Sequence, residues 1–184
     1  FGSDLEEGIY AFDFTGREIQ HVSLSALRAE RINNLDVRKG FALGDQTIDI
    51  LAGNLRDDGK LAVLRINPAW GGGTPPLTLL AHAKSSGNDI QDDSYGFALY
   101  RNPADGKVYV FERPKSGGKV RQYLLDGASG SIRVSRVRDL DSSGGTAEGF
   151  VADDEMGFVY ITEETKGIHK FHADGTSVDD AVAL

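Results

Sequence analysis

Six carboxylates fall within the nineteen-residue stretch AEGFVADDEMGFVYITEET, residues 147–165. Aromatic and β-branched residues stand between them, in the alternation typical of two short strands joined by a turn. Counting outward from that turn sets Glu148 opposite Glu163 or Glu164, and the length of the turn leaves the choice open. Facing side chains of a hairpin have Cβ atoms about 4.5–5.5 Å apart, so two carboxylates there repel unless something neutralises them. Calcium, which accepts oxygen ligands in irregular cages, is the simplest neutralising ion. The alternative is a solvated pair relieved by water and by nearby Lys166.

A second hairpin places polar residues at an equivalent position. Its strands cover residues 34–37 and 48–51, on either side of a Gly44-Asp45 turn. The same count predicts that Asn33 and Asn34 lie opposite Arg56. An arginine guanidinium is suited to paired hydrogen bonds with phosphate oxygens.

A third hairpin, with strands at 95–100 and 108–111, predicts that Tyr95 lies opposite Pro114 and Lys115. In all three hairpins the polar pair lies at the end away from the turn. If the hairpins stand around a common axis, these ends form one rim that carries acids, bases and a phenol. The rim is therefore predicted to be either a cation and phosphate site or a solvated edge.

The elements that must position these residues repeat along the chain. GIYAFDFTG (8–16) and GIHKFHADG (167–175) share the pattern G-I-x-x-F-x-x-x-G, and GKLAVLRI (59–66) and GKVRQYLL (118–125) are further copies. A period near 50 residues with strand-only content is typical of four-stranded propeller blades, with a repeated sandwich as the less favoured alternative. We therefore predict an all-β chain, a partial β-propeller that holds the end of one blade, two whole blades and most of another.

About three and a half blades cannot close a ring. Because the chain also begins at Phe1 rather than at Met, we expect residues 1–184 to form one partial propeller domain of a longer protein. Its partners are then the remaining blades or a second propeller domain. The weak helical signal at residues 24–30 accounts for two turns at most.

The composition narrows the function classes. The chain has 28 acidic and 20 basic residues, a net charge of −8, and such a surface disfavours nucleic acid and anionic membranes as partners. The absence of cysteine excludes disulfides, zinc–thiolate sites and a thiol nucleophile. The apolar runs are only a few residues long, too short to span a bilayer.

Four motifs resemble, in order and spacing, the β-propeller phytases. They are RINNLDVRKGF (31–41), SYGFALY (94–100), TAEGFVADDEMGFVYITEE (146–164) and GIHKF (167–171). The resemblance covers nearly the whole chain. It implies a calcium-dependent enzyme on a six-bladed propeller that removes phosphate from myo-inositol hexakisphosphate (phytate), taken as its calcium salt, by attack of a metal-activated water. We also expect a secreted or periplasmic bacterial protein.

The resemblance assigns roles to individual residues. Glu148 and Glu164 match calcium-ligating carboxylates at the cleavage site, which favours Glu164 over Glu163. Tyr95 matches a residue of the catalytic site that also contacts substrate phosphate. Arg56 and Lys115 match phosphate-binding residues, and the backbone carbonyl of Leu35 matches a ligand of a structural calcium.

The chain departs from the family pattern at several points. The Asp-Asp-Pro-Ala segment of the preceding blade, which supplies partner ligands, is absent. The family's asparagine directly before the arginine is Leu55 here, with Asn54 one position earlier, Thr165 replaces an aspartate, and His169 replaces a tryptophan. These departures leave a second hypothesis open, a non-catalytic or accessory propeller domain that binds calcium or a phosphorylated ligand. A third, less favoured, is an unrelated propeller binding module or lactonase-like hydrolase.

Overall fold

Four antiparallel sheets follow one another along the chain in the computed structural model, which describes residues 1–56, 59–83, 93–115, 117–141, 145–175 and 182–183. The first sheet has three strands: β1 (Gly2–Asp4), β2 (Gly8–Phe12) and β3 (Glu18–Ser23). The second has four: β4 (Ile32–Leu43), β5 (Gln46–Leu55), β6 (Lys60–Ile66) and β7 (Leu77–Ala83).

The other two sheets also have four strands each. One contains β8 (Ser94–Arg101), β9 (Val108–Pro114), β10 (Val120–Asp126) and β11 (Arg133–Leu140). The last contains β12 (Phe150–Asp153), β13 (Phe158–Glu163), β14 (Gly167–His172) and β15 (Val182–Ala183). Within every sheet the strands pair in chain order, as a meander.

This architecture confirms the predicted all-β partial propeller. The repeated glycine-led element forms β2, β6, β10 and β14, the last strand but one of each sheet. The described residues contain one three-stranded and three four-stranded sheets, in agreement with about three and a half blades, and β15 completes the last sheet, which was predicted to be most of a blade. One short helix, α1 (Leu24–Leu27), lies inside the weak helical segment and is capped by the Ser23 hydroxyl.

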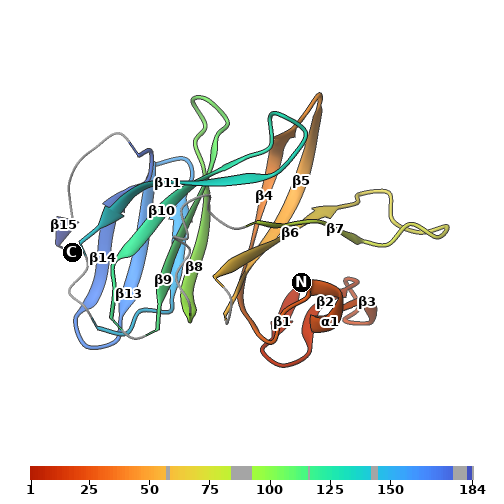
Figure 1. The fold of residues 1–184 in the computed structure, drawn as a ribbon, viewed down its shortest axis with the longest axis horizontal. Coiled ribbons are helices and arrows are strands. Elements are labelled where there is room, and N and C mark those ends of the chain that lie inside the picture. Colours follow the sequence, from red (N-terminus) through yellow and green to blue (C-terminus); the bar gives the residue numbers. More distant parts are fainter. Residues whose placement is uncertain (57–58, 84–92, 116, 142–144, 176–181, 184) are drawn as a thin grey trace.

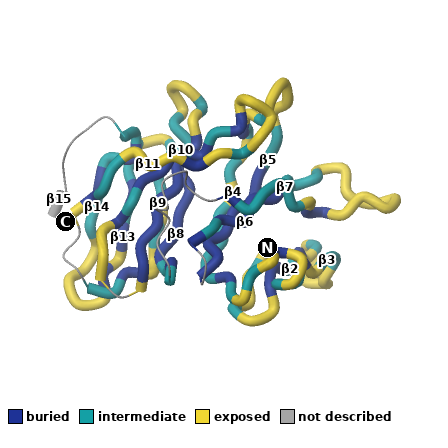
Figure 2. Tube along the Cα trace, in the orientation of Figure 1, coloured by how far each residue is buried: buried dark blue, intermediate teal, exposed yellow. Residues whose placement is uncertain are grey.

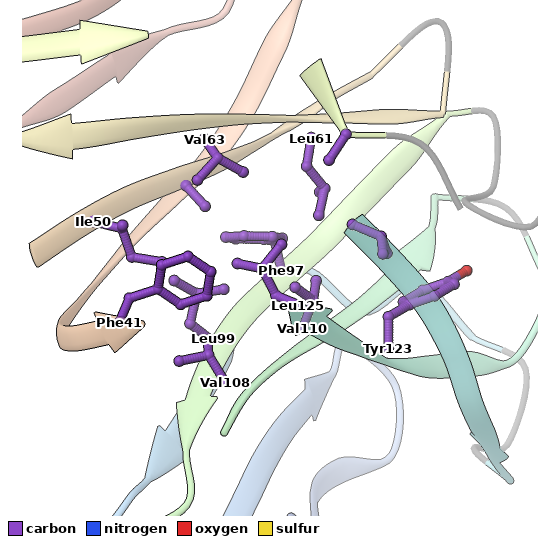
Figure 3. Packing of buried hydrophobic residues seen from close by; sticks show 13 residues of the cluster. Phe41, Ile50, Leu61, Val63, Phe97, Leu99, Val108, Val110, Tyr123 and Leu125 are labelled. Carbon is purple, nitrogen blue, oxygen red and sulfur yellow. The ribbon is translucent and has the colours of Figure 1, made fainter. Parts of the chain in front are cut away.

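The sheets stack side by side through apolar faces (Figures 1 and 2). A cluster that includes Phe41, Ile50, Phe97 and Val110 fills the space between the β4–β7 and β8–β11 sheets (Figure 3). Two further clusters join these sheets to their outer neighbours. Since burial of one such side chain contributes about 1.5–3 kcal/mol, the faces between sheets supply most of the cohesion.

The first strands of the three larger sheets are neighbours, with β8 between β4 and β12. The approach of β8 to β12 is close at Gly96, where a Cβ would lie 2.3 Å from Cε1 of Phe150 and 2.7 Å from the carbonyl oxygen of Ala147. No side chain fits at those distances, so glycine is required there. The contact brings the start of β8 against the residues that precede β12.

Two bulges correct the predicted register. Ile32 pairs with Leu55 and Leu35 with Gly53, so Asn33 and Asn34 together oppose Asn54, and the prediction that they face Arg56 was wrong. A second bulge in the same hairpin, between Arg38 and Phe41, adds to the shift. Each bulge inserts an extra residue into one strand, which simple counting from the turn does not include.

The third hairpin has a bulge at Tyr95. Ser94 pairs with Pro114 and Gly96 with Arg113, so Tyr95 lies between two paired positions. The amide of Lys115 donates to the carbonyl of Asp93 at 3.0 Å. The predicted backbone pairing of Tyr95 with Pro114 and Lys115 is therefore displaced, although the Lys115 side chain does reach the Tyr95 ring. In the described part of the chain, no helix has the length and apolar character to cross a membrane.

Candidate active site

Tyr95 and Glu148 meet at the rim formed by the starts of β8 and β12. A hydrogen bond to Glu148 raises the pKa of Tyr95, with desolvation and the negative charges of Glu148 and Glu164 acting in the same direction. The positive charge of Arg56 opposes them. Tyr95 is therefore a protonated donor at neutral pH, within electrostatic reach of both acids and of one base.

Two cations lie over the ring of Tyr95. The guanidinium carbon of Arg56 and the ammonium nitrogen of Lys115 are each 5.2 Å from the ring centroid, within the range of a cation–π contact. Arg56 is also fixed by Asp93, whose carboxylate accepts a hydrogen bond from Nε at 2.7 Å. The predicted phenol and both predicted bases therefore converge on one rim.

Glu163 and Glu164 point to opposite sides of β13, as neighbouring residues of a strand do. Glu163 is buried and accepts hydrogen bonds from the amide of Gly145 and from Nε2 of His169, each at 3.0 Å. Glu164 is exposed, and its amide donates to the carbonyl of Thr146 at 3.0 Å. Of the two acids left open by counting, Glu164 is thus the one available at the surface.

An open concavity separates the two exposed acids. It is lined by Glu148, Gly149, Thr162, Glu163, Glu164, Gly167 and Ile168. Carboxylate oxygens on such a surface are the ligands that calcium prefers, and this ion completes a coordination of six to eight oxygens with water or substrate. The chemistry of the two exposed carboxylates is therefore compatible with a calcium ion as ligand donors.

A group of three or more His, Asp or Glu side chains arranged around a cation site does not occur among the described residues. The calcium roles of Glu148 and Glu164 therefore stay predictions. Leu35 lines a neighbouring concavity that also includes Asn34 and Glu148. The metal role of its carbonyl stays a prediction.

Acidic residues in a turn are normally solvated, but Asp154 of the β12–β13 turn has protein partners. Its carboxylate forms an ion pair with Nε of Arg38 at 3.0 Å and accepts a hydrogen bond from the amide of Arg101 at 3.1 Å. Asp154 therefore connects three sheets at the opposite end from the rim. Glu155, next in the chain, is exposed as expected.

The departures from the family pattern have structural explanations. Leu55 is buried in the apolar cluster between the first two sheets, whereas Asn54 faces the rim and is itself fully buried. His169 contacts the buried Glu163 rather than the concavity. Thr165 is exposed beside the concavity.

Sequence reasoning missed two residues that shape the site. Asp93 orients Arg56, and its backbone has a φ of 59°, a conformation that favours glycine and asparagine over most residues. Glu163 was considered only as a ligand, and its burial beside Arg113 was not foreseen. Burial lowers the pKa of Arg113, and the charge of Glu163 opposes that shift. For Asp93, the sequence signal that could have indicated its role is its position two residues before Tyr95.

These features define a class: a partial β-propeller whose rim combines exposed carboxylates with phosphate-compatible cations. Comparison with known proteins then places the chain within it. The family model of the phytases matches residues 2–183. The 3-phytase of Bacillus subtilis (strain 168) is 30% identical over 174 residues, which cover 94% of this chain and 43% of that protein.

The chain therefore belongs to the phytase family. It spans less than half the length of the curated relative that it matches.

Proposed function

We propose that the protein is a calcium-dependent phosphomonoester hydrolase that releases phosphate from myo-inositol hexakisphosphate. The observation that carries this proposal is the convergence of Tyr95, Glu148 and Glu164 with Arg56 on one rim, expressed in the raised pKa of Tyr95. Membership of the phytase family supports the reaction class.

The residues of the rim divide the chemistry between them. Arg56 and Lys115 bind the oxygens of a substrate phosphate, which is necessary because the chain carries a net charge of −8 and repels a polyanion. Tyr95, protonated at neutral pH, donates a hydrogen bond to the same group. Asp93 holds Arg56 in the orientation that this binding needs.

Glu148 and Glu164 would hold the calcium. When bound, that ion shields phosphate charge and lowers the pKa of a water molecule that can attack phosphorus. A phosphate would then lie between the calcium held by the two carboxylates that line the concavity and the two bases that lie over Tyr95.

The test is phosphate release from calcium phytate by this chain and by the full-length natural protein, with and without a chelator. We expect release by the full-length protein that the chelator abolishes. A full-length protein without chelator-sensitive release would contradict the proposal.

Glu148→Gln tests the site assignment. We expect release to fall by about 100-fold, equivalent to about 2.7 kcal/mol in the barrier, with little change in melting temperature because Glu148 is exposed. Glu155→Gln, an exposed acid at the far end of the same hairpin, is the control and should retain wild-type release. Full activity in Glu148→Gln would remove Glu148 from the mechanism.

A second candidate function is an accessory propeller domain that binds calcium or a phosphorylated ligand without efficient turnover. The observation in its favour is that no group of three or more His, Asp or Glu side chains able to hold a metal ion occurs among the described residues. Binding of calcium and phosphate without phosphate release would identify this function. Secretion or a periplasmic location stays a prediction.

A further inference from the structure

Three asparagine side chains converge on the carbonyl oxygen of Tyr95. The Nδ2 atoms of Asn33, Asn34 and Asn54 lie 2.7, 3.0 and 3.3 Å from it. Asn34 Nδ2 also lies 3.3 Å from the carbonyl oxygen of Glu148. One amide group of β4 therefore binds the main chains of the two residues whose side chains meet at the rim.

The two bulges explain how this arrangement arises. In a regular strand Asn33 and Asn34 would point to opposite faces, but the bulge that sets both against Asn54 lets their amides reach one acceptor. Tyr95 lies in the other bulge, between paired positions, and Ser94 faces Pro114, which has no N–H to donate. The partly buried carbonyl of Tyr95 needs a donor, and the side-chain amides supply it.

Buried groups hold the amides in place from behind. Asn54 is fully buried, and its Oδ1 accepts a hydrogen bond from the amide of Asn34 at 2.8 Å while its Nδ2 lies 3.0 Å from the Ser94 hydroxyl. That hydroxyl donates to the buried carboxylate of Glu112 at 2.8 Å. Because each donor and acceptor in this series of hydrogen bonds is satisfied by the next, the network has few alternative arrangements.

We propose that Asn34, supported by Asn33 and Asn54, is a positioning residue that keeps Tyr95 and Glu148 in register across three neighbouring sheets. This inference rests on the proposed function, since it assigns those two residues to one reaction. The Asn34 side chain binds the main-chain carbonyls of Tyr95 and Glu148, so it acts through the backbone and not on the phenol or the carboxylate itself. We call the contacts of the three asparagine amides with the carbonyls of Tyr95 and Glu148 the clamp. A shift of reacting groups by about 1 Å can cost about 100-fold in rate, so loss of the clamp reduces turnover.

The test is Asn34→Leu in the full-length protein, a change that keeps the approximate shape and removes both donors. We expect kcat for phosphate release to fall about tenfold or more while KM changes less than threefold, because Arg56 and Lys115 remain in place to bind phosphate. Asn67→Leu is the matched control, since Asn67 Nδ2 also donates to a backbone carbonyl, that of Pro75 at 2.6 Å, in the β6–β7 hairpin. It should leave both constants unchanged.

A spectroscopic measurement separates positioning from general stability. The tyrosines of the full-length protein are labelled with 3-fluorotyrosine, and the ¹⁹F resonance of Tyr95 is assigned by its absence in Tyr95→Phe. We expect this resonance to shift or broaden in Asn34→Leu and not in Asn67→Leu. If Asn34→Leu does not fold, Asn34→Ser, which offers one donor instead of two, carries the same expectations.

An unchanged kcat, an equal loss in Asn67→Leu, or an unmoved Tyr95 resonance would each overturn the inference. If the wild-type protein releases no phosphate, the proposed function fails first. The ¹⁹F experiment then decides on the clamp alone, because it reports the environment of Tyr95 whether or not turnover occurs.

Discussion

The environment of each side chain, more than its type, separates the roles of the rim residues. Glu163 and Glu164 are adjacent and chemically identical, yet one is buried against Gly145 and His169 and the other is exposed beside the concavity. Alternation along β13 alone accounts for the difference. The same alternation places Leu55 in the core and Asn54 at the rim.

Arg56 offers a prediction at this scale. Its guanidinium binds Asp93 through Nε and lies over Tyr95, and a lysine in its place keeps the charge but loses the planar fork. We expect Arg56→Lys to raise KM for phytate about tenfold with a smaller effect on kcat. The control is Arg17→Lys, because Arg17 is an exposed arginine in the β2–β3 turn. A kcat loss larger than the KM rise would assign Arg56 to the chemical step rather than to binding.

At the scale of elements, bulges and turns decide which residues meet. Three bulged positions, two in the β4–β5 hairpin and one at Tyr95, displace the pairing that a count from the turn predicts. At the other end of the sheets, Asp154 in the β12–β13 turn reaches Arg38 of β4 and the backbone of β8. The sheets are thus joined by polar contacts at both ends and by apolar clusters between.

Removal of the Asp154 carboxylate should loosen this connection. Arg38 has a side chain only 14% exposed, so Asp154→Ala leaves a largely buried cation with fewer partners. We expect the free energy of unfolding to fall by about 1.5–3 kcal/mol, the range for hydrogen bonds to charged groups. Urea unfolding at pH 7 measures it, with Glu155→Ala as the exposed control in the same turn. Equal stabilities of the two variants would show that Asp154 does not connect the sheets energetically.

At the scale of the whole molecule, the net charge of the chain determines how the site can bind an anion. With a net charge of −8, the chain attracts cations and repels anions, so the proposed phosphate binding would depend on the local bases and on a bound cation. Stacking of the sheets places the starts of β8 and β12 and the ends of β5 and β13 on one rim (Figure 1). Acids and bases from three sheets therefore act together.

Calcium binding should stabilise the folded protein. A ligand at 100 times its dissociation constant contributes about 2.7 kcal/mol, which corresponds to a rise of about 5–10 °C in the melting temperature of a domain of this size. We expect calorimetric or fluorescence melting to show this rise for the wild type. The Glu148→Gln, Glu164→Gln double variant should not show it.

Non-specific binding of calcium to an acidic surface is the competing explanation for such a rise in melting temperature. The double variant Glu6→Gln, Glu155→Gln removes two exposed acids away from the concavity and serves as the control for charge. An equal melting shift in both double variants would contradict a calcium site at the rim.

The sequence by itself determined the strand content, the repeat of about 50 residues and the end of the hairpins at which the polar residues gather. These follow from local signals, because strand alternation, turn glycines and repeated motifs are legible without knowledge of distant contacts. Tyr95, Glu148 and Arg56 were predicted to share a rim on this basis, and the structure brings them together.

Only the tertiary structure decided the register and the partners. The bulges at Asn33–Asn34 and at Tyr95, the burial of Glu163 and the contact of Asp154 with Arg38 depend on neighbouring sheets that lie far away in the chain. A bulge is stabilised by what it contacts, here amides that satisfy the carbonyl of Tyr95 across a sheet boundary. Local sequence does not contain that acceptor, so the clamp on Tyr95 and Glu148 emerges only when the sheets are stacked.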